Sequence, residues 1–143
     1  MALKKKSYVT GSAEETADLG AILSENLKPG ASVALIGELG AGKTQFARGI
    51  ARGLGIEGSV TSPSYTIINT YGEAIKLNHI DLYRIGEAGE LDELGLEEYI
   101  YSSGITVIEW AEKAPEYLED MKFVVRFSHV SESERAIEIE ERD

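Results

Sequence analysis

A phosphate-binding loop is the strongest chemical pattern in the sequence. Gly37 and Gly42 frame the pattern G-x-x-x-x-G-K-T, which ends at Lys43 and Thr44. Glycines let backbone N–H groups curl around a phosphate, and a following helix directs its N-terminal partial positive charge at the same anion. Lys43 is expected to reach the β- and γ-phosphates of ATP, and the Thr44 hydroxyl is expected to bind Mg²⁺. The expected nucleotide contacts are Glu38, Leu39, Gly40, Ala41, Gly42, Lys43, Thr44 and Gln45.

Two acidic residues that follow apolar segments are candidates for handling Mg²⁺ and the attacking water. Glu109 follows the apolar run 105–108 in the layout of a Walker B strand, and Asp81 follows the segment 74–80. Glu109 could instead be a salt-bridged strand end, and Asp81 a turn or helix-capping residue. His79 shares a strand face with Asp81 by the period of two and is interpreted as a core histidine. Trp110 either lines the nucleotide cleft or belongs to the core.

Two further patterns have weaker chemical meaning. The segment 61–64 carries three hydroxyls after the loop's helix, where GTPases place a threonine that the γ-phosphate orders, although a plain turn fits as well. Gly53, Gly55 and Gly58 match the dinucleotide pattern G-x-G-x-x-G. That pattern must follow a strand and open a helix, whereas here it follows a helix, so we interpret it as a helix end and a turn.

Periodicity and breakers predict the elements that position these residues. Ser12 followed by Glu15 is a capping box, and the helix it opens carries an apolar stripe of Leu19, Ile22, Leu23 and Leu27 up to Pro29 and Gly30. The predicted strands are 5–10, 32–36, 66–70, 74–80, 105–108, 122–129 and 135–140, and the further helices are 43–54, 88–94 and 96–101. This alternation predicts one α/β domain over residues 1–143, a P-loop NTPase-like mixed, largely parallel sheet flanked by helices.

Composition limits the class of protein. The 143 residues suit one domain, and no apolar run is long enough to span a bilayer. Cysteine is absent and no secretory signal is visible, so we expect a cytoplasmic protein. The net charge of −11 disfavours direct binding to nucleic acid, which needs basic surface. Acidic residues cluster in 87–98 and 132–143, either as solvated faces or as a docking surface for a basic partner.

Four ordered signatures resemble the TsaE (YjeE) family of small bacterial P-loop ATPases. They are the phosphate loop at 37–44, Thr-Ser-Pro-Ser-Tyr-Thr at 61–66, His-Ile-Asp-Leu-Tyr-Arg at 79–84, and Val-Ile-Glu-Trp at 107–110. The family usually has threonine where Ser64 stands, a change that keeps the hydroxyl. The His-x-Asp-x-Tyr-Arg element is specific, whereas the phosphate loop alone is generic.

The resemblance implies a role in making threonylcarbamoyladenosine (t6A) beside the anticodon of tRNA. It implies two partners, TsaB and TsaD, with tRNA reached only through the complex. It implies Thr44 and Glu109 as Mg²⁺ ligands, Asp81 as essential for turnover, and Trp110 close to the nucleotide. By the same resemblance Arg135, and with it the region of Ser12, would lie near the adenine. The expected catalytic residues are thus Lys43, Asp81 and Glu109.

Two other functions fit the same motifs. A small-molecule kinase would need an acceptor pocket and a mobile lid, often arginine-bearing, and the region after Asp81 is acidic instead. A nucleotide-dependent switch with negligible hydrolysis would need neither, and the absence of an Asn-Lys-x-Asp signature argues against its GTPase form. We expect an ATPase that is slow alone and gains activity in a complex.

Overall fold

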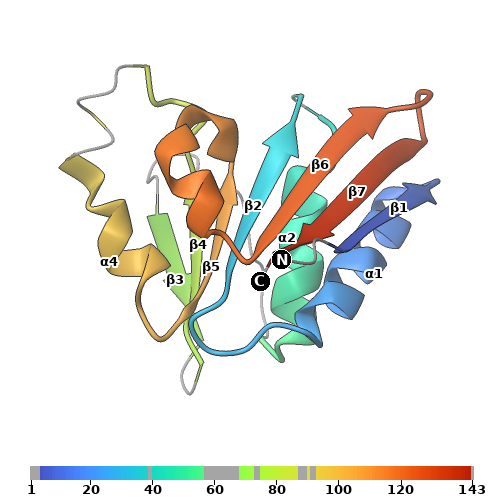
Figure 1. Cartoon of the computed structure of the whole chain (residues 1–143). Helices are drawn as coiled ribbons and strands as arrows, with labels where there is room; N and C mark the ends of the chain where they lie inside the picture. Colours follow the sequence, from blue (N-terminus) through green and yellow to red (C-terminus); the bar gives the residue numbers. More distant parts are fainter. Residues whose placement is uncertain are drawn as a thin grey trace.

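A computed structural model of the chain describes residues 4–38, 40–56, 68–72, 75–86, 90 and 93–142. These residues form one sheet of seven strands in the order β1-β7-β6-β2-β5-β4-β3 (Figure 1). The strands are β1 (Lys4–Thr10), β2 (Ser32–Gly37), β3 (Ile68–Tyr71), β4 (Leu77–Asp81), β5 (Ile105–Glu109), β6 (Phe123–His129) and β7 (Arg135–Glu141). The helical elements are α1 (Ala13–Ser24), α2 (Lys43–Gly53), α4 (Leu96–Ile100), η1 (Ala111–Lys113) and η2 (Pro115–Asp120).

The centre of the sheet is parallel and its outer pairs are antiparallel. Strand β2 pairs in parallel with β6 and β5, and β5 pairs in parallel with β4. The outer pairs β1–β7, β6–β7 and β3–β4 are antiparallel. The predicted mixed sheet is confirmed. Because the carboxyl ends of parallel strands meet at one edge, β2, β4 and β5 all end beside the phosphate loop.

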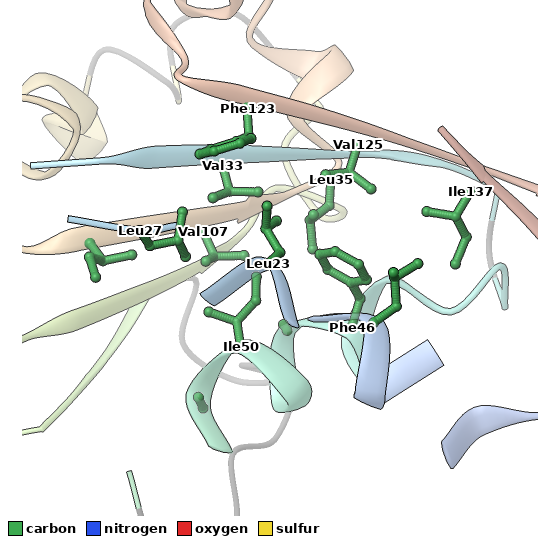
Figure 2. Close-up of a cluster of buried hydrophobic side chains, with 14 of the residues drawn as sticks. Leu23, Leu27, Val33, Leu35, Phe46, Ile50, Val107, Phe123, Val125 and Ile137 are labelled. Atoms are coloured by element: carbon green, nitrogen blue, oxygen red, sulfur yellow. The ribbon is translucent and has the colours of Figure 1, made fainter. Parts of the chain in front are cut away.

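Alternate residues of the central strands pack into two cores on opposite faces of the sheet. Val33 and Leu35 belong to the core shared with α1 and α2, whereas Ala34 belongs to the core shared with α4, η1 and η2. Figure 2 shows the first core, in which Phe46 and Ile50 of α2 reach the strands. This double cover explains why β2 and β5 read as continuous apolar runs.

Glycines let α1 and α2 touch backbone to backbone. A Cβ at Gly49 would overlap the carbonyl oxygen of Ala17, and a Cβ at Gly20 would overlap that of Phe46. A Cβ at Gly53 would meet the Ser24 hydroxyl. Helix propensity alone would favour alanine at these positions by about 1 kcal/mol. The close approach therefore decides the residue type, and it holds the helix that opens at Lys43 firmly against α1.

The first helix begins as predicted, but it differs from its prediction at Ile22 and at its C-terminal end. The capping box forms, with the Ser12 hydroxyl accepting from Glu15 N at 3.1 Å. However, Ile22 is 58% exposed, so the predicted apolar stripe is wrong at that residue. The buried face runs through positions 16, 19, 20 and 23, and position 22 lies beside it. The helix also ends at Ser24 rather than near Pro29, because the backbone N–H groups of residues 25–27 bond to carbonyls three residues back instead of four. Leu27 is buried, but it lies beyond the end of the helix.

Most other predicted elements are found, although strand β4 begins at Leu77 and ends at Asp81 rather than covering 74–80. Helix α2 ends at Gly53 and Gly55 has a φ of +80°, as expected for a helix end rather than a dinucleotide loop. Gly58, the segment 61–64 and most of the predicted helix 88–94 lie outside the described residues. In the described ranges, no helix has both the length and the apolar character needed to cross a bilayer.

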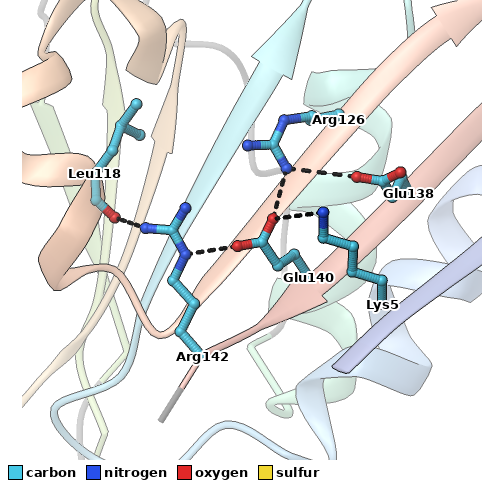
Figure 3. Close-up of polar contacts among 6 residues, drawn as sticks. All are labelled: Lys5, Leu118, Arg126, Glu138, Glu140 and Arg142. Atoms are coloured by element: carbon cyan, nitrogen blue, oxygen red, sulfur yellow. Dashed lines mark hydrogen bonds and ion pairs between the residues drawn. The ribbon is translucent and has the colours of Figure 1, made fainter. Parts of the chain in front are cut away.

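One member of the acidic C-terminal cluster is buried rather than solvated. Glu140 is 4% exposed and accepts from Arg142 Nε at 2.7 Å and from Arg126 at 3.0 Å (Figure 3). Arg142 also donates to the carbonyl oxygen of Leu118 at 2.5 Å, which ties β7 to η2. The hydrogen bond from Arg142 lowers the pKa of Glu140 below 4.5, supported by Arg126 and opposed by burial.

This pKa shift predicts an acid-sensitive contribution to stability. A carboxylate whose pKa is lower in the folded than in the unfolded protein stabilises the fold above the unfolded pKa, and that contribution disappears as pH falls through the folded pKa. We expect the free energy of unfolding to fall as pH drops below about 4.5, and Glu140→Gln to flatten that fall. Urea unfolding across pH measures it. Glu138 is only half-buried and lies 3.5 Å from Arg126. Glu138→Gln should therefore leave the fall of the free energy of unfolding at low pH as steep as in the wild type. Equal slopes in both variants would contradict the assignment.

Candidate functional site

The phosphate loop joins the end of β2 to the start of α2. Gly40 and Gly42 have φ angles of +76° and +105°, a region that favours glycine. A Cβ at Gly42 would also come within 3.3 Å of the Thr16 side chain on α1. The first-turn N–H groups of α2 have no intrahelical partners and face the loop. Leu39, predicted to contact nucleotide, lies outside the described residues.

Lys43 lies folded back over its own loop. Its Nζ donates to the carbonyl oxygens of Gly37 and Glu38, the latter at 3.1 Å. The same Nζ lies 3.7 Å from the centre of the Trp110 ring, which is a cation–π contact. Glu38, also predicted as a nucleotide contact, thus meets Lys43 through its backbone. An anion that binds in the loop would have to draw Lys43 out of these contacts.

Glu109 is the centre of a chain of buried polar groups. Its Oε1 accepts from the Thr44 hydroxyl at 2.9 Å, and its Oε2 lies 2.5 Å from His79 Nε2. Glu109 is 2% exposed and His79 is 0% exposed. His79 is therefore buried, as predicted, yet it is bonded to a candidate metal ligand rather than packed only among apolar groups.

Asp81 lies beside Glu109 at the ends of the two neighbouring strands. The two residues are direct partners in the parallel register of β4 and β5. The Asp81 carboxylate accepts from Tyr83 N at 2.9 Å, which forms a tight turn after β4. Lys113 Nζ donates to the carbonyl oxygens of Tyr83 and Ile85, so this turn is fastened to η1.

These groups line one pocket of about 350 Å³. Its walls are Gly40, Ala41, Gly42, Lys43, Thr44, Gln45, Asp81, Tyr83, Glu109 and Trp110. The pocket thereby brings together Trp110, both candidate acids and the predicted loop contacts that the structure describes, except Glu38, which does not line it. The pocket's size suits a small ligand such as a nucleotide.

Among the described residues that line the pocket, Lys43 is the one cation, and several carboxylates act on it. Burial lowers the pKa of Lys43 below 10.5, whereas the charges of Glu112, Glu109, Asp81 and Glu38 act in the opposite direction. Glu112 also accepts from Gly37 N at 3.3 Å. This concentration of carboxylates would repel a triphosphate, so a bound anion of that charge calls for a cation besides Lys43.

Trp110 lines the pocket through a backbone conformation unusual for its type. Its φ of +60° is the only positive φ at a described residue other than glycine. Such conformations are costly and cluster at functional sites. The turn places its ring 5.0 Å from the Tyr83 ring, at 40° to it, and beneath Lys43. Both predicted alternatives apply in part, because Trp110 lines the pocket and also packs against the core shared with α4, η1 and η2.

Arg135 contacts the phosphate loop directly, whereas Ser12 bonds to Thr16, which faces the loop at Gly42. Arg135 donates to the carbonyl oxygen of Gly40 at 3.3 Å and to three carbonyls of the turn between β6 and β7. Ser12 caps α1, and its carbonyl accepts from Thr16, whose methyl faces Gly42. Neither residue lines the 350 Å³ pocket, and their contact with adenine stays a prediction.

Sequence reasoning missed three contributors to the site. Tyr83 follows Asp81 by two residues in the signature at 79–84, and that proximity was a signal for a ring beside the candidate acid. Glu112 belongs to a three-residue turn that no periodic pattern marks. The bond between His79 and Glu109 joins residues 30 positions apart and has no local signal.

A phosphate loop between a strand and a helix, in a sheet that is parallel at its centre, defines the P-loop NTPase-like class of fold. The profile of the family "Threonylcarbamoyl adenosine biosynthesis protein TsaE" matches residues 10–137. The chain therefore belongs to the TsaE family, which is involved in the biosynthesis of t6A in tRNA.

Individual relatives agree with this assignment. The tRNA threonylcarbamoyladenosine biosynthesis protein TsaE of Treponema pallidum is 34% identical over 131 residues, covering 92% of this chain and 97% of the relative. The Bacillus subtilis protein of the same name is 37% identical over 136 residues, covering 94% and 85%. A crystal structure of Bacillus subtilis YdiB superposes with a TM-score of 0.82 at 32% identity, covering 99% of this chain and 88% of that one.

The contact between Lys43 and Trp110 predicts an optical signal. Trp110 is the only tryptophan in the sequence, and a phosphate that recruits Lys43 would remove a cation lying 3.7 Å from its ring. We expect Mg-ATP to change the fluorescence of Trp110 in titrations of the wild-type chain. Lys43→Ala should alter the ligand-free spectrum and reduce the change, whereas Arg52→Ala, on the distant end of α2, should do neither. A wild-type spectrum that saturating Mg-ATP leaves unmoved would contradict the prediction.

Proposed function

We propose that this chain binds ATP with Mg²⁺ at the 350 Å³ pocket and hydrolyses it for t6A biosynthesis. The observation that carries the proposal is the hydrogen bond of 2.9 Å between Thr44 and Glu109. It joins the last residue of the phosphate loop to the last residue of a neighbouring parallel strand. In P-loop NTPases, these two positions hold the metal that accompanies the phosphates.

The donor set at this bond fits Mg²⁺. Magnesium prefers oxygen ligands, and adjacent ligands of an octahedral ion at about 2.0–2.1 Å lie about 3 Å apart. The two oxygens of Thr44 and Glu109 have a similar separation, 2.9 Å. We propose these residues as the protein groups that hold the metal. When bound, Mg²⁺ would offset the charge of the phosphates among the carboxylates of the pocket.

The chain's own groups supply the other requirements of phosphoryl transfer. The N–H groups at the start of α2 would bind the phosphate oxygens. Lys43 would move from the carbonyls of Gly37 and Glu38 to the β- and γ-phosphates. Asp81, which lines the pocket beside Glu109, would orient the attacking water. Trp110 and Tyr83 would form the wall that limits access of bulk water.

We further propose that the chain acts with TsaB and TsaD and meets tRNA only through them, in the cytoplasm. The net charge of −11 supports an indirect role, because direct binding of tRNA needs basic surface. In P-loop enzymes, a positive charge supplied by a partner often gives the largest gain in rate. We therefore expect hydrolysis to be slow in the isolated chain.

Variants at three positions test the site. Thr44→Ala should raise the Mg²⁺ concentration needed for ATP binding by about tenfold or more, because an oxygen ligand is lost. Asp81→Asn should bind Mg-ATP normally yet lose about 100-fold or more in turnover. Glu109→Gln should resemble Thr44→Ala. Calorimetric titration and a phosphate-release assay measure both quantities. Normal binding and turnover in Thr44→Ala, or a loss of binding confined to Asp81→Asn, would contradict these roles.

Reconstitution tests the partnership. ATP turnover would be compared for the chain alone, the chain with TsaB and TsaD, and that mixture with tRNA. We expect a rise in turnover, or t6A formation that requires ATP, only in the mixtures. Asp81→Asn in the same mixtures shows whether the hydrolysis belongs to this chain. Full turnover alone, with no effect or binding of the partners, would favour a stand-alone ATPase or kinase.

A further inference from the structure

His79 occupies an unusual position for a buried histidine. It lies on β4, two residues before Asp81, and its side chain is 1% exposed. Its Nε2 lies 2.5 Å from Glu109 Oε2, and both residues are on the sheet face that α2 covers. Its Nδ1 is buried and has no hydrogen-bond partner among the residues that the structure describes.

The pattern of contacts assigns the proton on the ring. A carboxylate oxygen can only accept, so the short contact with Glu109 requires an N–H at Nε2. No described group accepts from Nδ1, so a second N–H there would have no partner. The tautomer with hydrogen on Nε2 therefore satisfies Glu109. It leaves the lone pair of Nδ1 buried, a cost that a purely apolar side chain would avoid.

His79 and Thr44 together fix both oxygens of Glu109. Oε2 is held by His79 from β4, and Oε1 is held by Thr44 from the start of α2. A carboxylate on a single contact can rotate about its last bond and exchange its oxygens, whereas one held on both sides cannot. The two contacts therefore fix the plane of the carboxylate and turn one oxygen, Oε1, toward Thr44 at the start of α2.

We infer that His79 is a positioning residue: it holds the Glu109 carboxylate so that Oε1 is presented to the metal side of the pocket. This inference rests on the proposed function, because it gives Glu109 a task that needs orientation. His79 does not line the pocket and would not touch the nucleotide. The geometry resembles metal sites in which a second residue orients the ligand and governs affinity.

Three substitutions at His79 separate orientation from packing. Gln places its amide nitrogen near the position of Nε2, whereas Asn places it near that of Nδ1, and Leu has no donor. The readout is the Mg²⁺ concentration that gives half-maximal ATP binding, followed by Trp110 fluorescence or calorimetry. ATP binding in the presence of a chelator and the melting temperature are measured in parallel.

We expect His79→Leu and His79→Asn to need about 10- to 100-fold more Mg²⁺, with His79→Gln close to the wild type. Binding without Mg²⁺ should change little in all three. Asn78→Leu is the matched control: Asn78 is also buried on β4, but its side chain bonds Thr106 at 3.3 Å on the opposite face. It should lower the melting temperature and leave the Mg²⁺ requirement unchanged.

The outcomes separate this inference from the proposed function. A wild-type chain without Mg²⁺-dependent ATP binding would overturn the proposed function. A wild type that behaves as proposed, with the same Mg²⁺ requirement in Gln, Asn and Leu variants, would overturn the positioning role alone. If His79→Leu does not fold, the contrast between Gln and Asn still decides, since equal values for those two would also overturn it.

Discussion

The hydrogen bond between Thr44 and Glu109 depends on almost every other feature of the fold. It spans 65 positions in sequence and requires the first turn of α2 to stand directly over the end of β5. The parallel register of β2 with β5 pairs Leu35 with Glu109, so that strand β5 ends beside the strand that feeds the loop. The backbone contacts at Gly20 and Gly49 fix α2 against α1. A shift of one residue in that register would turn Glu109 to the opposite face of the sheet.

The charges of the pocket follow from the same geometry. Parallel strands that end together bring Asp81 and Glu109 side by side, and the turn after β5 adds Glu112. Among the described residues that line the pocket, Lys43 is the cation that opposes them, and burial lowers its pKa while the neighbouring carboxylates act in the opposite direction. A site of this kind is poorly suited to a bare polyanion. It is suited to an anion that arrives with a divalent cation, which supports the proposal for ATP with Mg²⁺.

The sequence was informative wherever local rules decide the structure. The phosphate loop, the strand before it, the helix after it and the apolar run leading to Glu109 are local patterns, and each appears where it was predicted. The period of two also put His79 and Asp81 on one face. The burial of Ile22 was wrongly predicted because helix α1 turns the face that carries Gly20 toward α2, which leaves Ile22 exposed at the side. The partners of His79 and Glu112 could not be predicted, because they depend on strand order and on a short turn without periodicity.

The wall opposite the loop explains how a rigid frame can accept a ligand. Trp110 and Lys113 lie in one turn after β5. This wall is thus built by two turns bonded to each other, and Glu112 of the turn after β5 also accepts from Gly37 N of the phosphate loop at 3.3 Å. Lys43 is a further link between the two sides, since it contacts loop carbonyls and the Trp110 ring at once. Under the proposed function, movement of the Lys43 side chain would release its contacts to loop and wall, while the strands keep Glu109 and Asp81 in register. The proposed recognition of phosphates would then need little movement of the sheet, which suits a site that depends on one oriented carboxylate.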